Sequence, residues 1–312
     1  MVAESLVRAL TAALALATVF SACERTVDRL PALPAFTHEN AISIARFRAA
    51  DVRARKDPSA ENVGRLGMLY HAYQFQPEAR TCYLVARELA PDTFRWIYYQ
   101  AMLEKTVFRY EAAEELFLKA LELRPDNAEL SAELGDLYLM WARREDAQRY
   151  IARALELDPI QPVAALGMAR LLTLSQKWQA VIDLVTPLLE RYPRLSKAHQ
   201  YIAAAYGALG DPQREAYHQE EGEYGSDVAS ELMDALHELA VPAIMDGEPA
   251  RGAELLKLKC ARCHNHERIY DHDENRLWWA RTVRRMQRKA GWQWLTDDEA
   301  ASVVAYLTTR GS

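Results

Sequence analysis

The chain has 312 residues, of which 50% are hydrophobic and 26% are charged, which suits about two globular domains. Its net charge of -6 is mild and indicates no nucleic-acid partner, and its four cysteines are too few for a fold stapled by disulfides. The charge is uneven, because residues 251–312 carry twelve Lys and Arg against eight Asp and Glu, whereas the first 250 residues carry 26 against 36.

Residues 1–22 have the features of a signal peptide. A weakly basic start is followed by an apolar run from Ala9 to Phe20, which is too short to cross a bilayer as a mature helix. The run ends in Phe20-Ser21-Ala22-Cys23, which resembles the lipobox of bacterial lipoproteins. The resemblance implies a lipid on Cys23 and a place on the periplasmic side of a bacterial membrane. Phe20 departs from the aliphatic residue usual there, so cleavage to a soluble periplasmic protein and an uncleaved anchor remain alternatives.

Residues 23–59 are predicted to form a linker, which contains Pro31 and Pro34, and a lead helix over Glu39–Arg55. Beyond it the sequence repeats with a period of 34. The positions in register are Ala79, Ala113 and Ala147; Tyr83, Phe117 and Ile151; Ala86, Ala120 and Ala154; and Pro91, Pro125, Pro159 and Pro193. Gly67, Ala101, Gly135 and Ala169 share a small position. Residues 60–228 therefore resemble tetratricopeptide repeats, three clear, a fourth degenerate and a fifth weaker.

The resemblance implies a stack of helical hairpins. Small residues let the two helices of a hairpin approach closely, and the prolines stop each second helix. Because one hairpin cannot bury its apolar face, the repeats form one solenoid, whose groove is expected to dock a protein partner; a pure spacer is the alternative. Cys82 is expected to be a small buried side chain, and His71, His199 and His218 to be surface or packing residues without a metal-site grouping.

A linker helix over 229–248, interrupted at Pro242, leads to a domain boundary before Pro249. Residues 249–312 contain Cys260-Ala-Arg-Cys263-His264. This C-x-x-C-H motif indicates covalent attachment of one haem c, with a thioether bond to each cysteine and His264 as an iron ligand. A zinc site is the weaker interpretation, because only His266 and His272 could complete it. A redox dithiol would need a βαβ context, which the sequence lacks.

Residues 249–307 resemble a small class I cytochrome c domain. Gly252 lies eight residues before Cys260, and in that family the glycine allows the first helix to cross the last one closely. The family also places an aromatic residue at the Tyr306 position against the first helix. Leu295-Thr296, followed by Asp297, Asp298 and Glu299, predicts a capped start of that last helix.

Met286 is the only methionine after Met245 and therefore the only thioether that this module offers to iron. Its setting resembles a group of small bacterial cytochromes in which this methionine is the distal ligand, and His/Met ligation suits electron transfer because no position on the iron stays open. The alternatives are a packing role for Met286, with His266 or His272 as the ligand, and an open position. The arginines and lysine around Met286 are expected to form a basic collar that steers an acidic partner, or else a solvated helix face; they are Arg281, Arg284, Arg285, Arg288 and Lys289.

The sequence therefore predicts an all-α protein, a helical-hairpin repeat solenoid followed by a small cytochrome c-type helical domain. We expect an exported electron carrier rather than an enzyme, with a redox partner protein and a membrane anchor at Cys23. Two other functions remain open. A haem-based sensor or peroxidase-like enzyme needs an open iron site, and a cytochrome-assembly adaptor needs no covalent haem of its own.

Overall fold

The computed structural model describes residues 26–223, 231–260, 269 and 274–309. Every regular element in these ranges is a helix, which confirms the all-α prediction for this part of the chain. None of the described helices is both long and apolar enough to cross a membrane. Cys23 lies outside the described residues.

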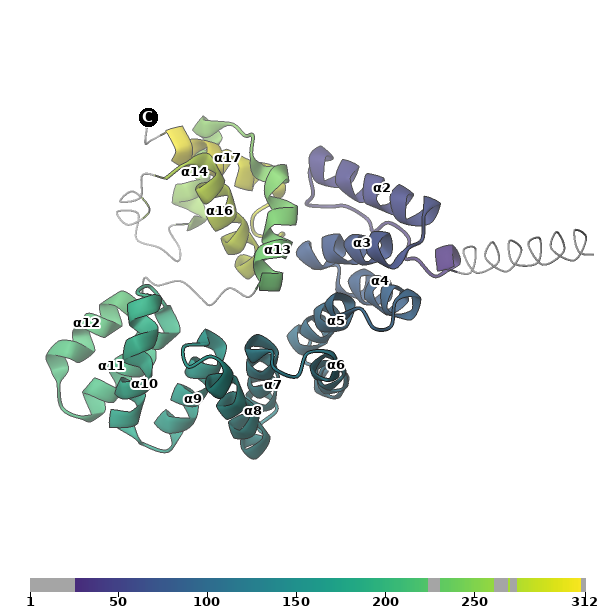
Figure 1. Cartoon of the computed structure of the whole chain (residues 1–312). Helices are drawn as coiled ribbons and strands as arrows, with labels where there is room; N and C mark the ends of the chain where they lie inside the picture. The colour runs from purple at the N-terminus through teal and green to yellow at the C-terminus, as the bar shows by residue number, and fades with distance from the viewer. Residues whose placement is uncertain (1–25, 224–230, 261–268, 270–273, 310–312) are drawn as a thin grey trace, which may run out of the picture. The chain divides into compact units, whose positions relative to one another are not determined.

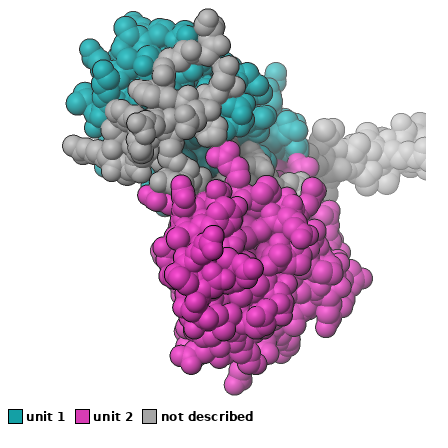
Figure 2. All heavy atoms as spheres, turned by 90° about the vertical axis from the view of Figure 1, so that its left-hand side faces the viewer, with its two compact units in different colours: residues 1–91, 231–312 teal, residues 92–230 magenta. Residues whose placement is uncertain are grey.

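The chain divides into two compact units (Figure 2). Unit 1 combines residues 1–91 with residues 231–312, and unit 2 is residues 92–230. The first repeat hairpin thus lies in the same unit as the C-terminal residues, although about 140 residues of chain separate them. The boundaries drawn from the sequence at 60, 229 and 249 follow the motifs and stay predictions.

Unit 2 is a series of four helical hairpins (Figure 1). Their helices are α5 (Phe94–Thr106) with α6 (Tyr110–Leu123), α7 (Ala128–Met140) with α8 (Arg144–Leu157), α9 (Pro162–Leu174) with α10 (Trp178–Arg191), and α11 (Ser196–Ala208) with α12 (Pro212–Glu223). In unit 1, α3 (Ala60–Ala72) and α4 (Gln76–Leu89) form another hairpin. All five hairpins expected from the repeat, including the weaker fifth, are present.

The repeat positions act as the spacing predicted. A side-chain carbon added to Gly135 would lie 2.7 Å from Ile151 of the neighbouring helix, so a small residue is needed where the helices cross. Tyr83, Phe117 and Ile151 are fully buried. Each of the helices α4, α6, α8 and α10 ends two residues before a proline of the repeat. Cys82 is buried, as expected, and burial raises the pKa of its thiol.

The rest of unit 1 consists of one N-terminal helix and the C-terminal helices. Its elements are α2 (Ala41–Lys56), α13 (Glu231–Ala240), the 3₁₀-helix η1 (Val241–Ile244), α14 (Pro249–Leu258), α16 (Arg276–Ala290) and α17 (Asp297–Thr309). Helices α14 and α17 cross at Gly252, where an added side-chain carbon would lie 2.0 Å from the carbonyl oxygen of Ser302 and 2.7 Å from Cβ of Tyr306. The expected close crossing at Gly252, with Tyr306 against α14, is therefore present.

The turns inside the hairpins share a left-handed backbone conformation that the sequence does not predict. Gln74, Phe108, Ala142 and Gln176 all have φ between 55° and 64°, and Gly210 has φ 78°. These five positions are spaced by 34 residues, and only the last is a glycine. A left-handed conformation costs a residue with a side chain about 1–2 kcal/mol relative to glycine. Four of the five turns therefore carry local strain.

We predict that Ala142→Gly stabilises unit 2 by about 1 kcal/mol, because it relieves the left-handed strain and removes only an exposed methyl group. The matched control is Ala204→Gly, an exposed alanine in the middle of α11, which we expect to destabilise the same unit by about 0.5–1 kcal/mol. Urea denaturation of both variants checks the pair. If both variants lost the same amount of stability, Ala142 would not be strained in the left-handed conformation.

His71 is buried on α3 with 3% of its surface exposed, and its Nδ1 lies 3.3 Å from the hydroxyl of Tyr83. Burial, reinforced by the charge of Arg288, lowers the pKa of His71 to about 3. The folded protein therefore keeps this imidazole neutral, whereas the unfolded chain takes up a proton below about pH 6.5. The contribution of His71 to stability is complete above that pH and declines as the pH falls from 6.5 toward 3.

We predict that wild type loses about 2 kcal/mol more stability than His71→Gln between pH 7 and pH 5. The figure follows because pH 5 lies about 1.5 units below the pKa of His71 in the unfolded chain, and each unit corresponds to about 1.4 kcal/mol. The comparison uses the change with pH within each variant, so a constant penalty of the substitution cancels. Urea unfolding, monitored by hydrogen exchange in peptides of α3, measures the free energy of unfolding of unit 1 at each pH. Equal losses in the two proteins would show that His71 titrates normally in the folded state.

Candidate functional site

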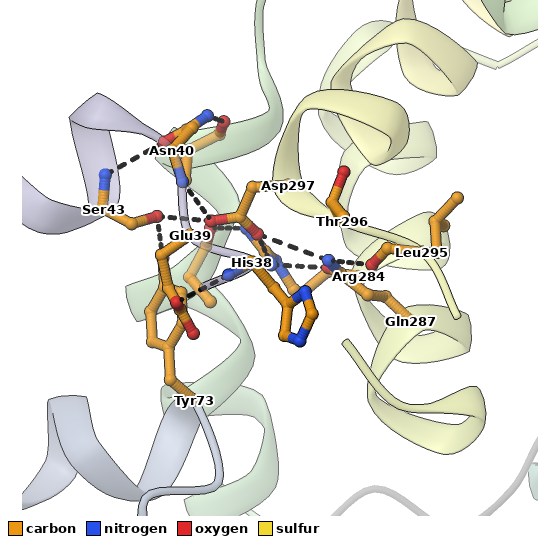
Figure 3. A network of polar contacts seen from close by, with 12 residues as sticks. His38, Glu39, Asn40, Ser43, Tyr73, Arg284, Gln287, Leu295, Thr296 and Asp297 are labelled. Atoms are coloured by element: carbon orange, nitrogen blue, oxygen red, sulfur yellow. Dashed lines mark hydrogen bonds and ion pairs between the residues drawn. The ribbon is translucent and has the colours of Figure 1, made fainter. Parts of the chain in front are cut away.

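A buried ion pair in unit 1 joins Arg284 and Asp297 and forms part of a network of polar contacts (Figure 3). Nη1 of Arg284 on α16 donates to Oδ1 of Asp297 at 2.6 Å, and the two side chains are 1% and 0% exposed. Nη2 of Arg284 also donates to the carbonyl oxygen of Ala240, where α13 ends. The pair therefore ties three C-terminal elements together, and removing one partner of such a pair typically costs about 3–5 kcal/mol.

The same carboxylate binds the N-terminal part of the unit. The hydroxyl of Ser43 on α2 donates to Oδ2 of Asp297 at 2.6 Å and lies 2.8 Å from the hydroxyl of Tyr73. The backbone N–H of Asn40 donates to Oδ2 at 3.4 Å, and the N–H of Asp297 donates to the carbonyl oxygen of His38 at 3.2 Å. Asp297 is thus a shared acceptor for α2 and α16, which lie far apart in the sequence.

Gln287, one turn beyond Arg284 on α16, completes this network. Its Nε2 donates to the carbonyl oxygen of Leu295 at 2.7 Å and lies 3.3 Å from Oδ1 of Asp297. The guanidinium of Arg284 lies over the rings of Tyr73 and Trp292, 5.5 and 5.7 Å from their centroids. The two Nη atoms and the ring-facing sides of the guanidinium therefore meet acceptors or aromatic rings, whereas the buried Nε of Arg284 has no hydrogen-bond partner among the described residues.

A second clamp holds the start of α17 from the opposite side. Nζ of Lys259 donates to the carbonyl oxygen of Trp294 at 2.6 Å and to Oε2 of Glu299 at 2.7 Å. Glu299 also accepts from the backbone N–H of Thr296, and the hydroxyl of Thr296 accepts from the N–H of Glu299, which is a capping box. Burial opposes ionisation of Glu299, but the bonds from Lys259 and Thr296 prevail and lower its pKa. The predicted capped start of α17 is present.

Cys260 follows Lys259 directly and is half-buried against an apolar cluster. The cluster is built by α14, α16, α17 and η1 and has Leu255, Leu256, Trp279, Val283, Leu295, Val303, Val304 and Leu307 among its buried members. Ile269, Trp278, Trp294 and Tyr306 pack around its margin, as Cys260 does. The thiol expected to carry haem therefore sits at the edge of an aromatic-rich core.

Met286 is half-buried on α16. It lies three residues after Val283 and seven after Trp279, so it shares their face of the helix. A c-type haem is attached through thioether bonds to its cysteines, and a methionine thioether can ligate its iron. Cys260 follows the end of α14 and Met286 lies on α16, and both helices contribute to the same cluster. The chemistry of these two described residues therefore fits such a group.

Other predicted ligands cannot be placed. Cys263, His264, His266 and His272 lie outside the described residues. Among the residues that the structure does describe, no three His, Cys, Asp or Glu side chains gather in a way that could hold a metal ion. The assignment of His264 and Cys263 to haem binding stays a prediction.

The expected basic collar around Met286 is wrong in part. Arg284 is buried in the ion pair with Asp297, and desolvation lowers the pKa of the largely buried Arg288 to about 10. Arg281 is half-exposed and paired with Glu238 of α13. The helical register explains the correction, because Arg284, Gln287 and Arg288 share a second buried face of α16, apart from the face of Trp279 and Val283.

Sequence reasoning also missed a histidine pair in unit 2. The Nδ1 atoms of His199 and His218 lie 2.9 Å apart, between α11 and α12, and the ring of Tyr206 stacks on His218. Nε2 of His199 lies 2.9 Å from the carbonyl oxygen of Pro193 and must donate to it, so its Nδ1 accepts from His218 when both rings are neutral. Their separation of nineteen residues carries no known spacing signal.

The fold has counterparts among solved structures. A tetratricopeptide-repeat protein from Parabacteroides merdae is 18% identical, with a TM-score of 0.51 over 86% of this chain and 92% of that one. PilF of Pseudomonas aeruginosa is 17% identical, with a TM-score of 0.48 over 64% and 89%. YrrB, described as a tetratricopeptide-repeat protein with an unusual peptide-binding site, is 18% identical, with a TM-score of 0.45 over 56% and 91%.

Sequence comparison gives less. No profile of a known protein family matches the chain. A segment of 79 residues is 35% identical to the CTR9 homologue of Arabidopsis thaliana, which is 25% of this chain but only 7% of that protein. The chain thus spans less than a tenth of that relative. At these identities the comparisons establish a helical-repeat fold of the tetratricopeptide type, and they give no evidence for a cytochrome c domain.

Proposed function

We propose that this protein is an exported c-type cytochrome that carries one covalent haem for one-electron transfer, with its repeats docking a protein partner. The single observation that carries the proposal is Cys260-Ala-Arg-Cys263-His264. A bound haem would supply a one-electron iron couple, and this chain would supply two thiols, one imidazole and one thioether.

The described residues support this function through their surroundings. The apolar cluster beside Cys260 would cover one side of a porphyrin and keep water away, which a protein module of about sixty residues needs for a stable centre. Met286, on the face of α16 that carries Trp279 and Val283, is the thioether expected to close the sixth position. A closed position favours electron transfer over catalysis.

The repeat unit supports the docking part of the proposal. Residues 92–230 carry 22 Asp and Glu against 15 Lys and Arg, a balance of 15 − 22 = −7. Stacked hairpins typically present an extended surface to a protein segment, and an acidic one favours basic segments. We propose that unit 2 recruits a partner protein, while a lipid on Cys23 holds the chain at the periplasmic face of a bacterial membrane, or cleavage leaves it soluble in the periplasm.

Two other functions are separable from this one. A haem-based sensor or peroxidase-like enzyme requires a vacant or displaceable iron position, so it predicts that the reduced wild-type protein binds carbon monoxide. A cytochrome-assembly adaptor requires no haem of its own, so it predicts a purified protein without stoichiometric covalent haem.

The first test is covalent attachment. When the full chain is expressed with a haem-attachment machinery, we expect one haem per chain that survives acid extraction, measured by the pyridine haemochrome spectrum and by intact mass. The double variant Cys260→Ala/Cys263→Ala should lose all of it, because no thiol remains at the motif. Cys82→Ala is the matched control and should keep full loading, since Cys82 is buried in the first hairpin. A colourless wild-type protein would refute the proposal.

The second test concerns the sixth ligand. We expect reduced wild type to bind no carbon monoxide at neutral pH and Met286→Ala to bind it readily, because the substitution opens the iron position. Met245→Ala is the control, since Met245 also packs near the apolar cluster but is not expected to ligate. Visible spectra of the reduced proteins before and after carbon monoxide measure the difference. Carbon monoxide binding by wild type would favour the sensor or enzyme instead.

A further inference from the structure

The start of α17 is gripped from two directions. On one side Lys259, the residue before Cys260, binds Trp294 and Glu299. On the other side Arg284 and Gln287, which flank Met286 on α16, bind Asp297 and Leu295. The segment Trp294–Glu299, which we name the α17 cap segment, is therefore the shared partner of the two backbone positions expected to hold haem.

We infer that the α17 cap segment is a positioning element that fixes Cys260 and Met286 relative to each other, with Lys259 and Arg284 as its two positioning residues. This inference rests on the proposed function. A haem attached at Cys260 would be held next to the end of α14, and Met286 would have to reach its iron from α16. The end of α14 and helix α16 must therefore be held at a fixed position relative to each other. Both are bonded to the same six residues, which can fix that position.

The chemistry of the two clamps suits a rigid reference. Arg284 and Asp297 are almost completely buried, so their charge-assisted bonds are not screened by water. The side chains of Lys259 and Glu299 are 25% and 16% exposed, and the capping box fixes Glu299 from its own helix. A functional constellation that must be held within about 0.5 Å needs such support from residues that touch no ligand.

The N-terminal helices brace the cap segment further. Ser43, Asn40 and His38 bond to Asp297 from the start of α2 and the residues before it. The cap segment therefore cannot shift without breaking bonds to α2, α14 and α16 together. Sequence distance makes this bracing non-local, since Ser43 lies 254 residues before Asp297.

The test uses the full, haem-loaded chain and compares Lys259→Met and Asp297→Asn with wild type. Both variants should attach haem fully, because the motif is intact. Both should bind carbon monoxide in the reduced form on the order of tenfold faster than wild type or more, since a charge-assisted hydrogen bond is worth at least that factor. Asp297→Asn removes the charge of Asp297 but keeps the shape of the side chain and one oxygen that can accept a hydrogen bond from Arg284.

Matched controls separate positioning from general damage. Lys257→Met removes an exposed lysine two residues before Lys259, and Arg281→Met removes the half-exposed ion pair to Glu238 on the same helix as Arg284. Both should bind carbon monoxide as slowly as wild type. Lys259→Arg should restore slow binding because it keeps a cation toward Glu299. Because both clamps act on one segment, their effects should not be independent. The double variant Lys259→Met/Asp297→Asn should therefore accelerate carbon monoxide binding by less than the product of the two single accelerations.

The outcomes are distinct. If wild type loads no haem, the proposed function fails, and the inference fails with it. If wild type loads haem, and Lys259→Met and Asp297→Asn bind carbon monoxide as slowly as wild type while Met286→Ala binds it fast, the function stands and the cap segment does not position the ligand. If Lys257→Met and Arg281→Met open the iron equally, the effect is general destabilisation, and the inference is overturned.

Discussion

The buried pair of Arg284 and Asp297 is the constraint on which unit 1 depends. Each charge would be costly to bury alone, and the pair is tolerable because hydroxyl, amide and carbonyl groups add further hydrogen bonds to it. Those groups come from both ends of the chain. The pair therefore dictates that α2 and the C-terminal helices fold as one unit rather than as two modules joined by a tether.

This arrangement changes how the C-terminal module is understood. About sixty residues give too little core to be stable alone, and a covalent cofactor was the obvious supplement on sequence grounds. The structure supplies another one, because α2 and the first hairpin contribute Ser43, Tyr73 and the backbone at His38 to the same network. The haem that we propose would thus enter a module already braced by polar bonds on the side of α16 opposite the face of Met286.

The repeats were predictable, whereas the network was not. A period of 34 follows from the short-range geometry of one hairpin, so the repeated prolines and small residues predicted all five hairpins. Gly252 likewise predicted the crossing of α14 with α17. Asp297 was predicted only as an acid in a first helical turn, because its partners lie 10 to 259 residues away and leave no local spacing. The left-handed turns escaped for another reason, since Gln74, Phe108 and Ala142 are not the residues that such a backbone favours.

The central claim is that this helical module holds one haem iron between an imidazole and the thioether of Met286. Near-infrared magnetic circular dichroism of the oxidised, full-length protein tests it most directly, because the charge-transfer band of low-spin ferric haem identifies the axial ligand pair. The account predicts one low-spin haem with histidine and methionine ligands. A protein without haem signal, or a haem with two nitrogen ligands or an open position, would contradict it.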